Sequence, residues 1–359
     1  MKTILVFEDS TRANFGGGQN ITLRVCDILK ERFNLRFVDF ISTSRYAQMV
    51  KDLYGEENLI SIGHGSISGH TGSWTWLKMI IVSCLYLLED SKKILKGLDP
   101  SDCICYSTGK RSLLIAAYLK KRYDIPYIHH AHLVENPNGI YFNIAKRLFA
   151  SAESVLCVSR TVMSSINTKN SQLVYNPSLN ARGFKGEKSD NKFVVAFVGS
   201  LIPIKGVEYF VDAAKLCHKD IEFRIYGEGF LRETLEKRAE GRVHFMGFES
   251  NIIDRYYEDI DILVIPTVLQ EALPLVVVDA KSVGLPVIVT SPGGQSEIVR
   301  DGIDGFHVPM KDANAIAEKV EDLAKNICLY RSMAKASYTS SWLFSYDIFN
   351  ERVITSFIS

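Results

Sequence analysis

The sequence predicts an α/β protein with two Rossmann-like domains, each a doubly wound parallel sheet, facing a cleft. Three observations predict this fold class. Short β-branched runs alternate with helical patterns along nearly the whole chain, the alternation restarts after residue 191, and 359 residues suit two domains. Strands that alternate with helices form βαβ units, and the strands of such units lie parallel.

The first half supplies six strand candidates, separated by helical stretches such as 21–33 and 112–123. These strands are predicted at 3–7, 35–40, 103–106, 126–130, 154–158 and 172–175. The second half restarts the pattern with strands at 192–199, 221–227, 243–247, 261–266 and 286–290. Each run is short and rich in Val, Ile, Phe or Tyr, which is typical of strands buried on both faces.

The best linker candidate is the polar segment 176–191, which carries no apolar period. It places the domains at 1–180 and 181–343. Apolar residues at helical spacing in 346–358 predict a last helix within 344–359, which we expect to pack back onto the first domain.

Composition restricts the function classes. The net charge is +1, so no overall field favours nucleic acid or an anionic membrane, and any anion site must be local. Seven scattered cysteines favour free thiols in a reducing compartment and argue against a zinc site. The first residues lack a signal-peptide pattern, and no apolar run approaches the roughly 20 residues of a membrane span. The sequence therefore predicts a cytoplasmic protein.

The apolar segment 75–93 leaves two interpretations open. Its apolar residues gather on one helical face, namely Leu77, Ile80, Ile81, Cys84, Leu85 and Leu88. One interpretation is a well-buried helix, and the other is a helix resting on a membrane interface beside Trp74 and Trp76. A peripheral position on the inner face of the membrane therefore stays open.

Two segments of the first half are candidates for ligand binding. The glycines of FGGGQN (15–20), Gly16 and Gly17 among them, let backbone approach an anion or a sugar, unless the segment is a plain flexible loop. Ile21 breaks the G-x-G-x-x-G pattern, which makes a nicotinamide enzyme a poor fit. In HHAH (129–132), alternation puts His130 and His132 on one face, and His132 is the best placed to line a cleft.

The second half carries three glycine-containing turns after strands. In VGSLIPIKG (198–206), Lys205 is expected to open a helix at the carboxyl end of a strand, where it could neutralise a phosphate. An ordinary surface lysine is the alternative. Gly227 of YGEG would allow a close approach of ligand, and the stretches 291–299 and 301–306 are interpreted as loops at the same edge.

The stretch QEALPLVVVDA (270–280) predicts a helix with a carboxylate before and within it. Pro274 suits a helix start, so Glu271 lies in the preceding loop, and the amides of Leu275 and Val276 form an anion site. Asp279 follows about 7–8 Å along the helix axis. The acids would take hydroxyls and the amides a phosphate.

In this order and spacing, these residues resemble the family 4 retaining glycosyltransferases (glycosyltransferase group 1), which have the GT-B fold. The G-R-L-x-x-x-K-G pattern of that family corresponds to 199–206 and its E-x7-E pattern to 271–279. Its GG-x-x-E loop corresponds to 293–297. Gly16 and Gly17 match its N-terminal glycine loop, and His132, six residues after Pro126, matches its cleft histidine.

The resemblance implies a metal-independent, retaining hexosyltransferase without a cofactor. Its partners would be a UDP- or GDP-linked sugar donor and a glycan or lipid-linked acceptor, in bacterial surface polysaccharide biosynthesis, with no nucleic acid. Lys205 would grip the diphosphate, Glu271 the donor sugar, Asp279 the ribose, and His132 would line the reacting sugar. The implied catalytic residues are His132, Glu271 and Lys205. The implied donor-binding set is Gly16, Gly17, Ser200, Lys205, Gly227, Glu271, Leu273, Leu275, Val276 and Asp279.

Two positions depart from the family pattern. Ser200 replaces the usual Arg, which removes one cation from the diphosphate grip, and Asp279 is one methylene shorter than the usual Glu. These departures keep two alternatives open: a catalytically weak GT-B binding partner in a glycosylation complex, and a nucleotide-sugar epimerase.

Overall fold

The chain forms two compact units in the computed structural model. One, the N-terminal unit, comprises Met1–Val174 and Asn350–Ser359, and the other, the C-terminal unit, comprises Tyr175–Phe349. The structure describes all residues except 9–15, 41–43, 63–72, 140–141, 179–182, 186–191, 292 and 359, and it leaves the side chains of 73–80, 82–84 and 257 undescribed. Most of the predicted linker lies outside the described residues, and the predicted boundaries at 180/181 and 343/344 stay predictions.

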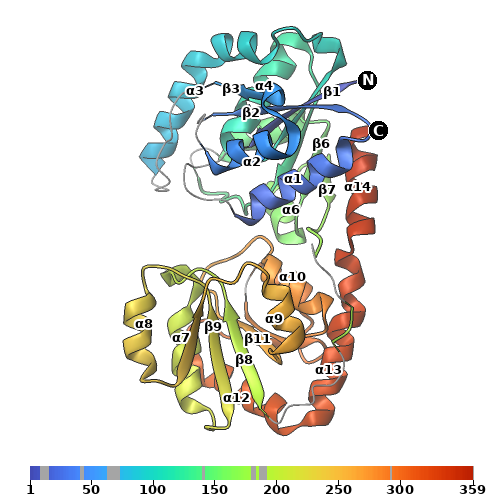
Figure 1. Ribbon diagram of the computed structural model, residues 1–359. Coiled ribbons are helices and arrows are strands. Elements are labelled where there is room, and N and C mark those ends of the chain that lie inside the picture. Colours follow the sequence, from blue (N-terminus) through green and yellow to red (C-terminus); the bar gives the residue numbers. More distant parts are fainter. Residues whose placement is uncertain are drawn as a thin grey trace. The chain divides into compact units, whose positions relative to one another are not determined.

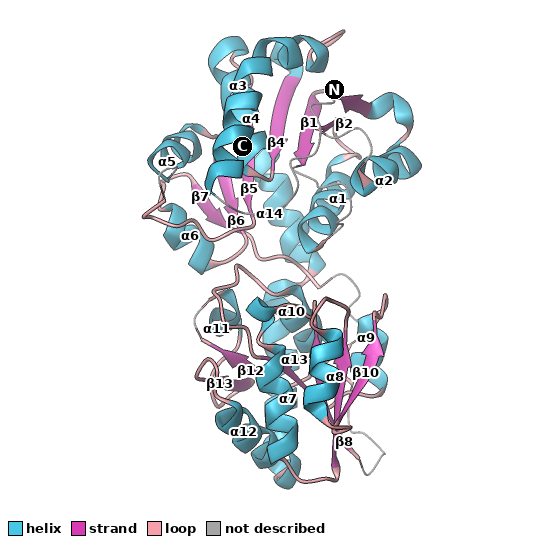
Figure 2. Ribbon diagram, turned by 90° about the vertical axis from the view of Figure 1, so that its left-hand side faces the viewer, coloured by secondary structure: helices cyan, strands magenta, loops and turns pink. Residues whose placement is uncertain are grey.

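The N-terminal unit is built on a parallel sheet in the order β3-β2-β1-β4-β5-β6-β7. All six residues of β1 are buried, because helices cover both faces of the sheet (Figures 1 and 2). The described strands are β1 (Thr3–Glu8), β2 (Asn34–Asp39), β3 (Leu59–Ser61), β4 (Cys103–Ser107), β5 (Tyr127–Ala131), β6 (Ser154–Cys157) and β7 (Ser171–Leu173).

The helices of this unit alternate with its strands. They are α1 (Gly17–Leu29), α2 (Arg45–Tyr54), α3 (Ser73–Ile94), α4 (Lys110–Tyr123), α5 (Phe142–Ser151) and α6 (Arg160–Ile166), with short 3-10 turns at Glu56–Asn58 and Pro100–Asp102. The last helix of the chain, α14 (Tyr346–Ile358), ends in this unit, where the ring of Phe357 packs against those of Phe33 and Tyr106.

The C-terminal unit repeats the architecture with a parallel sheet in the order β10-β9-β8-β11-β12-β13. Its strands are β8 (Phe193–Val198), β9 (Ile221–Tyr226), β10 (Val243–Gly247), β11 (Ile262–Ile265), β12 (Val287–Thr290) and β13 (Gly305–Val308). Its helices are α7 (Val207–Leu216), α8 (Arg232–Ala239), α9 (Ile252–Glu258), α10 (Leu275–Ser282), α11 (Gly294–Ile298), α12 (Ala313–Lys325) and α13 (Ile327–Ser340), with 3-10 turns at Pro203–Lys205 and Ser341–Phe344.

Two helical layers sandwich the second sheet. Helix α7 packs against α8 and α12 on one face, and α10 packs against α9 and α13 on the other (Figure 1). Helix α12 shows why such a helix forms: Asp312 caps its first turn by accepting from the amide of Ala315 at 2.9 Å, and Ile316, Val320 and Leu323 place one apolar stripe in the core.

Each sheet has one point at which its strand order reverses. In the N-terminal unit this switch point lies between β1 and β4, and in the C-terminal unit between β8 and β11. The connections that leave the two strands at such a point run over opposite faces of the sheet, so a crevice opens beyond the carboxyl ends of these strands. The fold therefore indicates where each unit can hold a ligand.

The two doubly wound sheets confirm the predicted fold class, and the predicted strands all lie within or beside observed ones. The sequence reading missed β3 and β13. The interpretation of 301–306 as a loop at the ligand-binding edge is wrong, because Gly305 pairs with Val287, the first residue of β12. Residues 301–304 thus lead into the amino edge of the sheet, at its opposite end.

Where its side chains are described, helix α3 does not fit the interpretation of a well-buried helix. Of its apolar stripe, Ile81 is 52% exposed, Leu85 74% and Leu88 62%. The side chains of Trp74 and Trp76 lie outside the described residues. Within the part of the chain that the structure describes, no helix combines the length and apolarity that crossing a membrane requires.

Candidate active site

The candidate site of the C-terminal unit is centred on an ion pair at its switch point. Lys205 follows β8, Glu271 follows β11, and the Nζ of Lys205 lies 2.8 Å from Oε1 of Glu271. The hydroxyl of Thr267 donates to the same oxygen at 2.7 Å. Both charged side chains are largely buried, at 28% and 19% exposure, yet each keeps access to solvent. The pair places a cation and a fixed carboxylate where a ligand is expected.

The turn that carries Lys205 is held tightly against the neighbouring strand end. Lys205 ends a 3-10 turn and lies two residues before α7. The prediction that Lys205 opens this helix is therefore wrong. Gly206 follows with φ of 62°, and a Cβ there would lie 2.0 Å from the carbonyl oxygen of Pro266. Only glycine permits this approach, which brings the lysine beside β11.

The Gly293–Gly294 turn supports Glu271 from the other side. The amide of Gly294 donates to the carbonyl of Glu271 at 2.7 Å, and a Cβ on Gly294 would lie 1.8 Å from the carbonyl oxygen of Ala272. The turn therefore packs directly on the backbone of the loop 271–273. The pair of glycines, which match the GG-x-x-E loop of the family pattern, therefore fixes the loop that carries the carboxylate of Glu271.

Helix α10 begins where the sequence predicted. Pro274 is its N-cap residue, and Leu275 and Val276 are its first two residues, both half-buried. The amides at the start of a helix have no acceptor within the helix, and the helix dipole adds partial positive charge there. Leu273, buried, precedes Pro274 in the same loop as Glu271. The start of α10 thus lies only a few residues after Glu271, the carboxylate that pairs with Lys205.

Asp279 lies in the second turn of α10. Its Oδ1 accepts a hydrogen bond from the hydroxyl of Ser178 at 2.9 Å. It also lies near the fully buried Tyr256, whose hydroxyl pKa is raised well above its ordinary value by burial and then by the charge of Asp279. Asp279 is therefore a fixed carboxylate of the same helix that starts at the proposed anion site.

The remaining predicted residues of this unit lie in the loops that follow β8 and β9. Ser200 is exposed, two residues after the end of β8. Gly227 follows β9 with φ of 143°, and its amide donates to Gly247 at 2.7 Å. A Cβ on Gly227 would lie 1.9 Å from the carbonyl oxygen of Gly199, so the two loops are in backbone contact. The predicted residues of the C-terminal unit thus occupy one edge of its sheet.

The N-terminal unit holds neutral or hydroxyl-bonded groups at the corresponding edge. Glu8 ends β1, and its Oε2 accepts hydrogen bonds from the hydroxyls of Thr22 on α1 and Thr108, the latter at 2.8 Å. Gly16 caps α1 and Gly17 is its first residue, both exposed. The glycines therefore start a helix that Glu8 ties to the switch point of this sheet.

Three histidines follow at β5, and the predicted alternation is confirmed. The rings of His130 and His132 lie 4.2 Å apart, whereas the Nδ1 of His129 pairs with the hydroxyl of Ser107. Burial lowers the pKa of His132 to about 4 and that of His129 to about 3, and it holds His130 well below its ordinary pKa. All three are therefore neutral at physiological pH.

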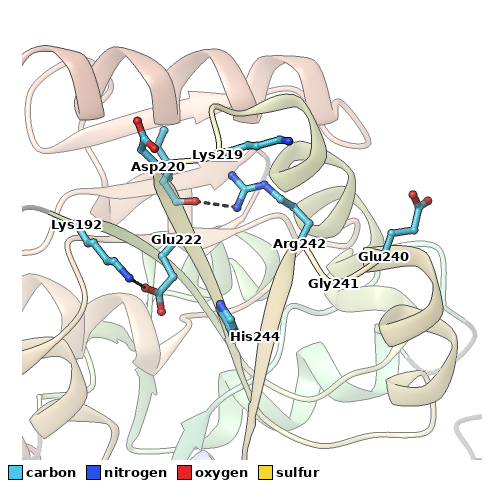
Figure 3. A pocket seen from close by; sticks show the side chains of 9 residues that line it. Lys192, Lys219, Asp220, Glu222, Glu240, Gly241, Arg242 and His244 are labelled. Carbon is cyan, nitrogen blue, oxygen red and sulfur yellow. Dashed lines mark hydrogen bonds and ion pairs between the residues drawn. The ribbon is translucent and has the colours of Figure 1, made fainter.

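Two further observations concern other parts of the described chain. Among the residues that the structure describes, no group of three or more His, Cys, Asp and Glu side chains is placed to hold a metal ion. A cavity of about 600 Å³ lies at the amino ends of β8, β9 and β10, away from the candidate site (Figure 3). Its charges are mixed: Lys192 lies 4.0 Å from Glu222, and Arg242 donates to two carbonyls.

The structure brings together Lys205, Glu271 and the start of α10 in one unit, and it places Gly16, Gly17 and His132 in the other. Their roles stay predictions. The sequence reading missed Thr267, which donates to Glu271. Its position directly after a predicted strand was the available signal, but a threonine there is common.

Comparison with known proteins identifies the class of this protein. Residues 192–326 match the family model described as glycosyl transferases group 1, a range that contains Lys205, Glu271 and α10. An uncharacterized glycosyltransferase of Methanocaldococcus jannaschii is 28% identical over 65% of this chain and 68% of its own length. The chain belongs to the group 1 (family 4) glycosyltransferases, which have the GT-B fold.

Two further relatives have names that state the acceptor on which they act. One is the N,N'-diacetylbacillosaminyl-diphospho-undecaprenol α-1,3-N-acetylgalactosaminyltransferase of Campylobacter jejuni, 27% identical over 68% of this chain and 65% of that relative. Another is an Escherichia coli α-1,3-galactosyltransferase acting on α-D-GlcNAc-diphosphoundecaprenol, 32% identical over 38% of this chain and 39% of its own length.

Solved structures show the same fold along the whole chain. HepE of Anabaena in complex with UDP aligns with a TM-score of 0.79 at 17% identity, covering 100% of both chains. The lipopolysaccharide outer core galactosyltransferase WaaB aligns with a TM-score of 0.75 at 15% identity, covering 100% of this chain and 99% of its own. At these identities the likeness establishes the GT-B architecture of two sheets and nothing finer.

Proposed function

We propose that this glycosyltransferase uses a nucleoside-diphosphate sugar as donor, without a metal ion and with retention at the anomeric carbon. The observation that carries this proposal is the Lys205–Glu271 pair at 2.8 Å, beside the start of α10 at the switch point of the sheet. A diphosphate needs local positive charge and amide donors, and this edge offers both. HepE, which shares the fold, was solved with UDP and with UDP-glucose.

Different residues bind the three parts of the donor, which are the diphosphate, the sugar and the ribose. Lys205 and the amides of Leu275 and Val276 hold the diphosphate, Glu271 accepts from hydroxyls of the donor sugar, and Asp279 accepts from the ribose. In the reaction, the bond between the anomeric carbon and the diphosphate oxygen breaks while the acceptor oxygen attacks the same face of the sugar. The acceptor proton leaves with the diphosphate, whose developing charge Lys205 and α10 stabilise.

The N-terminal unit supplies the acceptor side of this proposal. The unit also contributes to donor binding: His132, neutral and beside His130, lines the reacting sugar, and the backbone amides of Gly16 and Gly17 bind the donor. The relatives in Campylobacter and Escherichia coli act on undecaprenol-diphosphate-linked sugars. A glycan attached to such a lipid, in the synthesis of a bacterial surface polysaccharide, is therefore the proposed acceptor class.

A lipid-linked acceptor also gives a role to the exposed face of α3. Ile81, Leu85 and Leu88 lie on one side of the helix, and the exposed cations Lys92 and Lys96 follow them. Apolar side chains beside lysines suit the interface of an anionic membrane. We propose that this face rests on the membrane that holds the acceptor.

Vesicle flotation tests the membrane contact. Vesicles of phosphatidylglycerol and phosphatidylcholine should carry the protein, and the double variant Leu85→Gln, Leu88→Gln should lose most of this binding. Leu216→Gln alters a similarly exposed leucine on the C-terminal unit and should keep it. A wild-type protein that stays out of the vesicle fraction rules this contact out.

A donor panel tests the enzymatic proposal. Release of nucleotide is measured with UDP-glucose, UDP-galactose, UDP-N-acetylglucosamine and GDP-mannose, each with and without a glycosyl-diphospholipid acceptor. The proposal predicts acceptor-dependent release with one of these donors. Isomerisation of a donor without acceptor would instead identify an epimerase, and no binding at millimolar nucleotide sugar would favour a binding partner without activity.

A further inference from the structure

The chain enters the C-terminal unit through Tyr175–Ser178, which we call the entry segment. The segment is held in place within this unit at both of its ends. The ring of Tyr175 packs edge-on against that of Phe344 at 5.2 Å, and the amide of Ser178 donates to the carbonyl of Phe344 at 3.0 Å. Ser178 is only 6% exposed. The positions of the hydroxyl groups of the segment are therefore fixed by packing.

The first of these hydroxyls meets a carboxylate of the proposed donor site. Ser178 donates to Oδ1 of Asp279 at 2.9 Å. Its Oγ also lies 3.1 Å from that of Ser282, which donates to the carbonyl of Asp279 at 2.7 Å. Ser178 thus joins a small hydroxyl cluster that spans the side chain and the backbone of Asp279.

The second hydroxyl meets the carboxylate of the GG-x-x-E loop. Tyr175 donates to Oε1 of Glu297 at 2.7 Å. Glu297 lies in α11, the short helix that begins at Gly294, whose amide holds the carbonyl of Glu271. Asp279 and Glu297, two carboxylates at positions of the family pattern, are therefore both bonded to hydroxyls of one four-residue segment.

We propose that the entry segment orients two carboxylates of this unit, with Ser178 as the positioning residue of Asp279 and Tyr175 as that of Glu297, on the short helix whose first amide holds the loop of Glu271. The inference rests on the proposed function, since that function assigns Asp279 and Glu271 to the donor. A short Asp side chain points its oxygens in one direction only when a donor fixes the rotation of its carboxylate, and hydrogen bonds to charged groups are the strong ones. The segment thus sets the direction in which Asp279 presents its carboxylate to a donor.

The direction matters more here than it would for the longer glutamate of the family pattern. Asp279 has one methylene less to adjust its reach, and the fully buried Tyr256 lies near enough for the charge of Asp279 to raise its pKa. Without Ser178, the carboxylate loses a hydrogen bond that fixes its orientation toward the nucleotide sugar. Donor binding then weakens, while the groups at the reacting carbon are unchanged.

The test measures donor KM and kcat with the nucleotide sugar of the panel that is released fastest. Ser178→Ala is expected to raise donor KM about fivefold and Tyr175→Phe about threefold, with kcat within about twofold of wild type in both. Ser178→Thr keeps the hydroxyl and is expected to restore most of the donor KM. The matched control is Ser337→Ala, which removes another buried serine hydroxyl of this unit, bonded to the carbonyl of Leu285 at 2.7 Å.

The outcomes separate this inference from the function on which it rests. A wild-type protein that binds no nucleotide sugar overturns the proposed function and the inference with it. Donor use by the wild type, with donor KM unchanged in Ser178→Ala, overturns the inference alone. An equal rise of KM in Ser337→Ala also overturns it, because the effect would then follow from loss of stability and not from orientation.

Discussion

The two sheets place different chemistry at the same edge. In the C-terminal unit, a lysine, a carboxylate and a helix start meet at the β8/β11 switch point. In the N-terminal unit, the β1/β4 switch point holds Glu8 under two hydroxyls, and neutral histidines follow at the adjacent strand β5. One edge is suited to a charged diphosphate and the other to a neutral hydroxyl-bearing ligand. We therefore expect the shared architecture to determine where a ligand binds in each unit, and the side chains to determine which ligand binds.

Removing the cation should break the charged edge most severely. Lys205→Ala is expected to lower kcat/KM about 10²- to 10³-fold, because preorganised groups that stabilise a leaving charge contribute on this scale. Steady-state nucleotide release with the best donor measures it. Lys215→Ala, which removes an exposed lysine paired with Glu240 on the same unit, should leave the rate unchanged. Equal rates in Lys205→Ala and wild type would remove Lys205 from the site.

Crowding the glycine turn should disturb the same edge through the backbone. In Gly294→Ala the new Cβ would lie 1.8 Å from the carbonyl oxygen of Ala272, so the loop that carries Glu271 must shift. Overpacking of this kind costs about 1–3 kcal/mol, and donor affinity should fall as well. Thermal unfolding and calorimetry with UDP measure the two effects.

The control for this change is Gly18→Ala, where nothing lies within 4 Å of the added Cβ. It should leave the melting temperature unchanged or slightly higher, since alanine favours a helix. A Gly294→Ala variant as stable as Gly18→Ala would show that the turn is not packed as described.

Acid should weaken the neutral edge. The pKa of His132 falls from 6.5 to about 4 and that of His129 to about 3 on folding, so below pH 6.5 the unfolded chain binds protons that the folded one does not. Stability is then full above pH 6.5 and is lost toward pH 4. Each such histidine lowers the free energy of unfolding by about 1.4 kcal/mol per pH unit in that window.

Calorimetric unfolding between pH 7.5 and 5.5 measures this loss. The variant His218→Asn, at an exposed position of the C-terminal unit, should keep the full pH dependence. A melting temperature that does not change over this range would contradict neutral, buried histidines at the end of β5.

Restoring the arginine of the family pattern should slightly improve donor binding at the charged edge of the C-terminal sheet. Ser200 is exposed, so Ser200→Arg adds a cation without burying it. An exposed charge pair contributes at most about 1 kcal/mol, so donor KM is expected to fall by no more than about fivefold. Ser200→Gln adds length without charge and should not reproduce this. An unchanged KM in Ser200→Arg would mean that the diphosphate lies beyond reach of position 200.

Much of the fold could be predicted from the sequence, because buried parallel strands are continuous apolar runs. The two missed strands lack that signal: β3 has three residues, and β13 begins at Gly305 within a turn-rich stretch. The exposure of α3 could not be predicted either, since an apolar helical stripe looks the same whether it faces a core or solvent.

The meeting of Lys205 and Glu271 could be predicted because its signals are local. Lys205 and Glu271 each lie in a loop after an apolar strand, and the strand order brings the loops together. Thr267 also follows a predicted strand, but a threonine there is too common to be informative, and Tyr175 and Ser178 had no such signal. Their roles depend on contacts such as Ser178 to Asp279, 101 residues apart, which only the folded unit creates.

A crystal structure of the protein with UDP tests the central claim most directly. We expect the diphosphate of UDP to lie within hydrogen-bond distance of the Nζ of Lys205 and of the amides of Leu275 and Val276. UDP bound elsewhere on the C-terminal unit, with these groups free of phosphate, would contradict it.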